Sequence, residues 1–140
     1  MALVKLEDSL KLDIPEIDSQ HETLVSLVNL LHENMLQGSG KAALDDILSQ
    51  LLQHTQTHFA YEEKLMSLYK YPGYEKHKSE HKKLMQHLED LTARYKKGDL
   101  LLSFAVMLEL KGWAVVHIEK SDIPLGTFLH KQKGTRTTLA

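Results

Sequence analysis

Residues 44–69, LDDILSQLLQHTQTHFAYEEKLMSLY, contain the pattern that decides the fold. Apolar residues recur there at alternating steps of four and three, which is the spacing of one face of an α-helix. Leucines form the first half of this face, and His58 and Glu62 continue it in the second half. Burying ionisable side chains without partners costs on the order of a few kcal/mol. On one helix such a change is weak evidence, because a lone buried histidine is often a core residue with a hydrogen bond. The same change on four helices would indicate an ion inside a helical bundle.

The same periodicity runs through the rest of the chain. Four long segments show it, and breaks containing glycine or proline separate them at residues 38–40, 71–73 and 97–99. Short connections make sequential helices antiparallel neighbours. We therefore predict an all-α fold, an up-down-up-down antiparallel four-helix bundle. The expected helices cover residues 19–37, 41–69, 74–96 and 100–122.

Composition limits the possible functions. A chain of 140 residues forms about one domain, and the absence of cysteine excludes disulfides, iron–sulfur clusters on thiolates and covalent c-type haem. A formal net charge of -2 gives no general electrostatic attraction to nucleic acid. Glu7 and Asp8 stand where a secretory signal needs an apolar run, and no apolar stretch is long enough to span a membrane. We expect a soluble, cytoplasmic protein that does not insert into membranes.

The two ends of the chain lie outside the predicted bundle. Residues 1–17 are expected to form an N-terminal arm along the bundle, anchored by Ile14 and Ile17, and residues 18–126 the bundle itself. Residues 127–140 contain basic residues and no acids, which is typical of a mobile tail, although a weak docking role is the alternative. Ser19 and Glu22 have capping-box spacing at the start of the first helix, although Asp18 could cap it instead.

Seven side chains are candidate metal ligands. Residues four apart lie on one face of a helix, which allows each of two such pairs to converge on a common point. The last histidine and aspartate are five apart, about 140° around an ideal helix, and reach one site only if the helix unwinds or widens. Pro124 gives a reason for this, and regular helix is expected to end near Asp122. The seven are His21, His58, Glu62, His77, His81, His117 and Asp122.

These seven ligands nearly saturate two octahedral metal ions. Two six-coordinate ions offer twelve positions. Five imidazoles fill five, two bridging carboxylates fill four and a bridging oxide or hydroxide fills two, so one position stays open. This coordination is ordinary for iron, whereas zinc prefers four ligands. Neighbouring candidates are expected to play no part: His54 flanks the site without binding, Glu63 is solvated, and the remaining histidines are surface residues, namely His32, His87 and His130.

Four runs of the sequence resemble the hemerythrin family, specifically its single-domain bacterial members. They are IDSQHETL, HFAYEEKLM, YPGYEKHKSEHKKL and WAVVHIEKSDIPLG, and together they span roughly residues 14–126. The resemblance implies a non-haem, oxo- or hydroxo-bridged di-iron centre that binds O2 reversibly. It places three histidines on an iron without a vacancy and two on the iron that binds O2, with both carboxylates bridging. The first three are His77, His81 and His117, and the other two are His21 and His58.

The resemblance also places the walls of an O2 pocket, at Phe59, Trp113, Ala114 and Ile118. Simple core packing explains apolar residues at these positions equally well. The family usually has a leucine where this chain has Ala114, and the smaller side chain is expected to widen the pocket. Leu6 and Asp13 replace the family's usual tryptophan and glycine in the arm.

The expected function is oxygen carriage, storage or delivery, with O2 as ligand and an O2-consuming enzyme as a possible partner. The sequence shows no dedicated acid or base beside the site, which favours binding over catalysis. Two alternatives stay open. One is a di-iron enzyme acting on peroxide, nitric oxide or ferrous iron, and the other is an O2 sensor that works through a separate partner.

Overall fold

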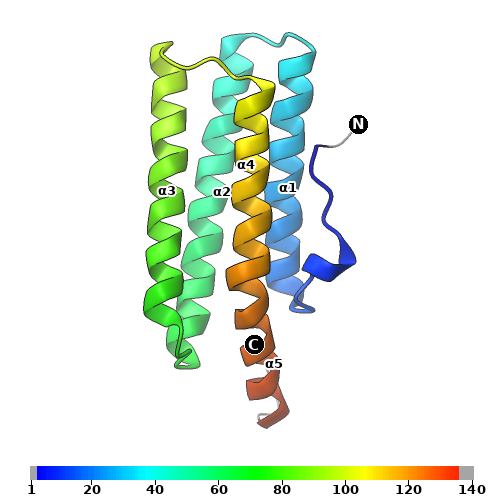
Figure 1. Cartoon of the computed structure of the whole chain (residues 1–140), viewed down its shortest axis with the longest axis vertical. Coiled ribbons are helices and arrows are strands. Elements are labelled where there is room, and N and C mark those ends of the chain that lie inside the picture. Colours follow the sequence, from blue (N-terminus) through cyan, green and yellow to red (C-terminus); the bar gives the residue numbers. More distant parts are fainter. Residues whose placement is uncertain (1–2, 136–140) are drawn as a thin grey trace.

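The structure, a computed structural model, describes residues 3–135, with side chains up to residue 132. Four long helices pack antiparallel, and the chain then continues from α4 through a π-helical turn into α5 (Figure 1). The predicted four-helix bundle is confirmed. The elements are η1 (Asp8–Leu10), α1 (Pro15–Leu36), α2 (Lys41–Leu68), α3 (Tyr74–Lys97), α4 (Phe104–His117), η2 (Ile118–Asp122) and α5 (Ile123–Thr135). None of the helices described here has the length and apolar character needed to cross a bilayer.

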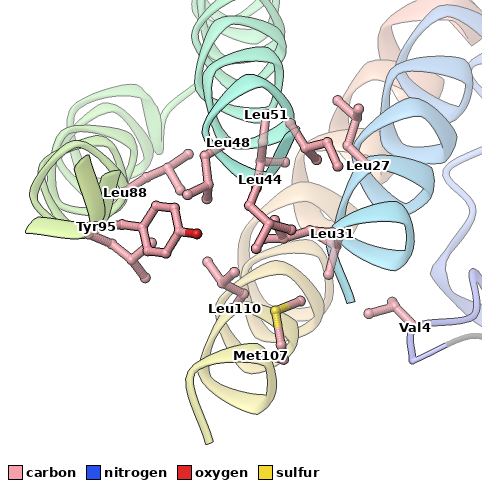
Figure 2. Packing of buried hydrophobic residues seen from close by; sticks show 13 residues of the cluster. Val4, Leu27, Leu31, Leu44, Leu48, Leu51, Leu88, Tyr95, Met107 and Leu110 are labelled. Atoms are coloured by element: carbon pink, nitrogen blue, oxygen red, sulfur yellow. The ribbon is translucent and has the colours of Figure 1, made fainter. Parts of the chain in front are cut away.

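The core consists of two apolar clusters. The first fills one end of the bundle, where leucines of α2 face Leu27 and Leu31 of α1, Leu88 of α3 and Leu110 of α4 (Figure 2). The second joins the arm, the opposite ends of α1 and α2, and α5. The candidate ligands fall in sequence between the positions that build these clusters. The polar layer is therefore enclosed by an apolar layer on each side.

The first helix begins earlier than predicted. Pro15 is its first residue and Ile14 its N-cap. Proline suits this position because its fixed φ is helical and its missing N–H has no intrahelical acceptor there. The expected caps at Asp18 and Ser19 are therefore wrong. The Asp18 carboxylate instead accepts a hydrogen bond from the backbone N–H of Leu12 at 2.8 Å, which ties the arm to the helix.

The predicted mobile tail is also wrong over the part of it that the structure describes. Helix α5 extends to Thr135, and Leu125 and Leu129 are fully buried against the arm. The Nε2 atom of His130 lies 2.6 Å from the backbone oxygen of Leu12. Residues 136–140 of the predicted tail, and residues 1–2 of the predicted arm, lie outside the described residues.

Asp13 adopts a left-handed backbone conformation, with φ of 58°. Glycine reaches this region at no steric cost, and aspartate is among the few other residues that tolerate it. The expected departure from the family's glycine is thus compatible with the same turn. The arm keeps its path along the outside of α1, where Asn29 exchanges two hydrogen bonds of 2.8 Å with the backbone of Val4 (Figure 1).

Replacing two helical glycines by alanine should have different effects on the free energy of unfolding. A Cβ on Gly112 of α4 meets nothing within 4 Å, so Gly112→Ala should raise the free energy of unfolding by about 0.5–1 kcal/mol through helix propensity. A Cβ on Gly126 of α5 approaches Leu12 Cγ to 2.8 Å, which displaces the arm and cancels that gain. Urea unfolding of both variants measures the difference. Equal stabilisation by the two substitutions would contradict the close packing of the arm on α5.

Candidate metal centre

All seven predicted ligands converge in the polar layer. Every one is buried, with exposed fractions from 0% at Glu62 and Asp122 to 9% at His117. Helix α1 contributes one of them, α2 two, α3 two, and the α4–η2 segment two. Their ligand atoms form two overlapping groups that share the carboxylates. One group is Glu62, His77, His81, His117 and Asp122, and the other is His21, His58, Glu62 and Asp122.

A π-helical turn brings His117 and Asp122 to the same site. The turn η2 adds one residue to the helix, and the N–H of Ile123 donates to the oxygen of Ile118, five residues back. The predicted widening of the helix is therefore present, but regular helix does not end at Asp122. It continues because Pro124 is the second residue of α5, where its missing N–H is tolerated.

Glu62 faces both halves of the centre with different oxygens. Its Oε1 lies 3.1 Å from Nε2 of His77 and 3.0 Å from Nε2 of His81. Its Oε2 lies 3.3 Å from Nε2 of His58. A carboxylate directed in this way has one oxygen available to each of two ions.

Asp122 divides its oxygens in the same manner. Its Oδ1 lies 3.0 Å from Nε2 of His77 and 3.1 Å from Nε2 of His117. Its Oδ2 lies 2.9 Å from Nε2 of His21. Both carboxylates are thus placed between a three-histidine half and a two-histidine half, as bridging ligands require.

Several ligand atoms are paired with one another by hydrogen bonds, but three others in the same cluster are not. His117 Nε2, Asp122 Oδ1 and Glu62 Oε2 are buried and form no hydrogen bond within the described part of the chain, although nitrogens and oxygens lie about 3 Å apart. Orphaned polar atoms in a buried site cost free energy that a bound ion recovers. The donor set, five imidazoles with two shared carboxylates, fits a pair of cations.

The electrostatics also favour positive charge at this site. Burial alone would lower the pKa of His58, but Asp122 and Glu62 outweigh it and raise the pKa to about 9. The pKa of His77 is raised to about 9 by the same balance. Burial and Asp122 act to raise the pKa of Glu62, yet hydrogen bonds from the surrounding imidazoles lower it to about 2. The carboxylates are ionised and compensated by protons, which a metal ion would replace.

Three side chains contact the outer ring nitrogens of ligand histidines, a role that the sequence analysis did not predict for them. The Nδ1–H of His58 donates to the amide oxygen of Gln20 at 2.6 Å, and that of His81 donates to Oε2 of Glu63 at 3.0 Å. The prediction that Glu63 is solvated is therefore wrong. Glu63 does point away from Glu62, but towards helix α3, and its side chain is only 27% exposed.

The third supporting residue is Glu80. Its Oε2 lies 3.6 Å from Nδ1 of His117, and the buried hydroxyl of Ser121 donates a hydrogen bond to the same oxygen. A common rule links the supporting residues: each one is the chain neighbour of a ligand on its own helix and contacts a ligand on the next helix. That adjacency is the sequence signal that could have identified them.

An internal cavity of about 90 Å³ borders the centre on one side. Its walls include both histidines of the two-histidine half, Asp122 and one histidine of the other half, His117, whereas His77 and His81 do not line it. Apart from these proposed ligands and Thr55, the lining is apolar, and it comes from all four bundle helices. The predicted pocket residues all line this cavity: Phe59, Trp113, Ala114 and Ile118.

The other histidines divide evenly between surface and interior. His87 is exposed, as expected, and His54, which was expected to flank the site without binding, is also exposed. His32 is only 7% exposed, with its ring centroid 6.0 Å from that of Phe104, and His130 is half-buried against the arm. The prediction that these two are surface residues is wrong, because α1 is covered by α4 at His32 and α5 is covered by the arm at His130.

Comparison with known proteins gives the family. The model of the Hemerythrin HHE cation binding domain matches residues 12–124. The chain belongs to the hemerythrin family. A bacteriohemerythrin of Pseudomonas paraeruginosa (strain DSM 24068 / PA7) is 33% identical over 126 residues, with 87% of this chain and 78% of that protein covered. A bacteriohemerythrin of Stenotrophomonas maltophilia (strain R551-3) is 30% identical over 124 residues, with the same coverage.

Solved hemerythrin structures share the fold. A wild-type hemerythrin superposes with a TM-score of 0.84 at 28% identity, covering 90% of this chain and 97% of that one. A hemerythrin variant in which a leucine is replaced by alanine gives a TM-score of 0.85 at 29% identity, covering 91% and 97%. The chain is therefore a hemerythrin-like cation-binding protein with a buried histidine and carboxylate cluster suited to two metal ions.

Metal uptake should release protons. At pH 7, below the raised pKa of about 9, His58 and His77 carry protons in the metal-free protein, and each must lose one to bind a cation. Loading metal-free protein at pH 7 should release about two protons per chain from these residues, and the release should vanish as the pH rises well above 9. Calorimetry in buffers of different ionisation enthalpy counts the protons. Saturable uptake without proton release at pH 7 would contradict the assignment.

Proposed function

We propose that this protein binds O2 reversibly at a non-haem di-iron centre and serves as an oxygen carrier, store or delivery module. The observation that carries the proposal is the position of the cavity. It borders both histidines of the two-histidine half, His21 and His58, as well as His117. In the proposed centre the two-histidine half is the one with a coordination position left free. A small apolar cavity beside a vacant position on a metal suits a diatomic gas.

The ligand set selects the metal. Five imidazoles and two bridging carboxylates suit octahedral iron and exceed the four ligands that zinc prefers. Two ferrous ions held by these residues would supply the electrons that reversible O2 binding needs. The proposed iron ligands are His21, His58, Glu62, His77, His81, His117 and Asp122.

The residues of the cavity favour binding over turnover. Phe59, Trp113 and Ile118 present apolar surface that excludes water. Apart from the proposed ligands, Thr55 is the lining residue whose hydroxyl could donate a proton to a bound gas. The Thr55 hydroxyl, however, donates to the backbone oxygen of Leu51 at 2.7 Å. The cavity wall would therefore donate few protons to bound O2, and O2 that is not protonated can be released unchanged. An O2-consuming enzyme is the kind of partner that such a carrier would serve.

Optical cycling tests the proposal. Anaerobic ferrous protein exposed to O2 should develop a charge-transfer band that disappears when O2 is removed, over repeated cycles. His21→Ala, which removes a ligand beside the cavity, should abolish the band. His54→Ala is the matched control, because His54 is exposed on the same helix as His58. Irreversible oxidation with turnover of peroxide or nitric oxide would overturn carriage in favour of an enzyme.

Ala114 should control how long the oxygenated form survives. Ala114→Leu fills part of the cavity of about 90 Å³ and leaves less room for water, so decay of the oxygenated form should slow several-fold. Absorbance at the charge-transfer band measures the decay. Ala105→Leu, the same substitution at an exposed position of α4, should leave the rate unchanged. Equal decay rates in the two variants would show that Ala114 does not limit water access.

A further inference from the structure

The two halves of the centre differ in the charge that supports their histidines. In the three-histidine half, His81 donates its Nδ1–H to the Glu63 carboxylate at 3.0 Å, and the Glu80 carboxylate lies 3.6 Å from Nδ1 of His117. Both acids are partly shielded from solvent, with side chains 27% and 34% exposed. This half is therefore backed by two negative charges beyond its ligands.

The two-histidine half has no comparable charge. His58 donates its Nδ1–H to Gln20, a neutral amide, at 2.6 Å. Nδ1 of His21 is buried and forms no hydrogen bond within the described residues. Glu62 and Asp122 cannot create a difference between the halves, because each directs one oxygen to either side. The difference in supporting charge therefore comes from the residues behind the histidines, and it adds to the extra histidine of the three-histidine half.

Such support changes how strongly an imidazole binds a metal. A carboxylate that accepts the outer N–H fixes the ring orientation and raises the basicity of the inner nitrogen, and its loss typically reduces metal affinity by about 10- to 100-fold. The added negative charge also attracts a dication directly. Both effects act on the three-histidine half alone.

Glu80 is fixed in place to provide this support. The hydroxyl of Ser121 donates to its Oε2, and Ser121 belongs to the π-helical turn that positions Asp122. The turn therefore positions the bridging ligand Asp122 and, through Ser121, also the Glu80 carboxylate beside His117. Glu63 depends on no such contact, because its own hydrogen bond to His81 already joins α2 to α3.

We propose that the two metal ions enter in a fixed order, with the three-histidine half filled first, and that Glu63 and Glu80 are positioning residues that strengthen the preference its third histidine gives. The inference rests on the proposed two-metal centre. It adds that the centre passes through a one-metal form in which the half bordering the cavity is still vacant.

Titration of the metal-free full-length chain with Co2+ tests the order, because its visible absorption reports each ligand environment. The first equivalent should bind at least 10-fold more tightly than the second. In Glu63→Gln/Glu80→Gln the first affinity should fall by about 10- to 100-fold and approach the second. Gln20→Glu should instead tighten the second. Glu75→Gln, which removes an exposed acid from the surface groove beside Glu63, is the matched control and should change neither.

Ligand variants identify the half that fills first. With one equivalent of Co2+, His21→Ala should retain the wild-type spectrum and affinity, and His77→Ala should lose both. The reverse result, equal wild-type affinities, or an unchanged affinity for the first ion in Glu63→Gln/Glu80→Gln would overturn the inference while the two-metal centre stands. Wild-type protein that binds a single ion would instead refute the centre itself. If the double variant fails to fold, as its melting curve would show, Gln20→Glu still decides the role of these positions.

Discussion

The shared use of Glu62 and Asp122 by two sets of histidines is the interaction on which the whole structure depends. Both carboxylates are completely buried, in a layer enclosed by apolar clusters at either end of the bundle. Buried charges of this kind cost several kcal/mol each unless they are compensated. Protons on the imidazoles compensate them in the metal-free chain, and two cations with five nitrogen ligands do so more completely. The four helices are thus held in register by the same atoms that form the site.

That constraint explains the irregular end of α4. His117 and Asp122 must reach the same point, and five residues of regular helix would direct them about 140° apart. The π-helical turn adds the residue that closes this difference, and α5 resumes at Ile123 so that its apolar side chains cover the centre. The arm then covers α5, since Leu12 contacts both Gly126 and His130. The two terminal segments therefore close the end of the bundle nearest the ligands.

The features that could be predicted from the sequence are those that follow from the helical periodicity of one segment. The seam from Leu44 to Glu62 predicted the helical face and two of the ligands, and the five-residue spacing of His117 and Asp122 predicted the widened turn. Prediction failed where a contact crosses between elements. Glu63 does not lie on the helical face that contains Glu62, so the periodicity predicted that its side chain is solvated. The Glu63 side chain instead points at the neighbouring helix, where it contacts His81. The tail contained no acids, but the burial of Leu129 depends on the arm, which lies more than a hundred residues earlier in the chain.

Neighbours of the ligands also explain why the centre is asymmetric. Gln20, Glu63 and Glu80 each follow or precede a ligand on one helix and support a histidine on the next, so support passes from α1 to α2, α3 and α4. No corresponding residue supports the histidine of α1, because Nδ1 of His21 forms no hydrogen bond within the described residues. His21 also lines the cavity. The ligand histidine with the least support therefore lies beside the cavity, whereas His81, which Glu63 supports, does not line it.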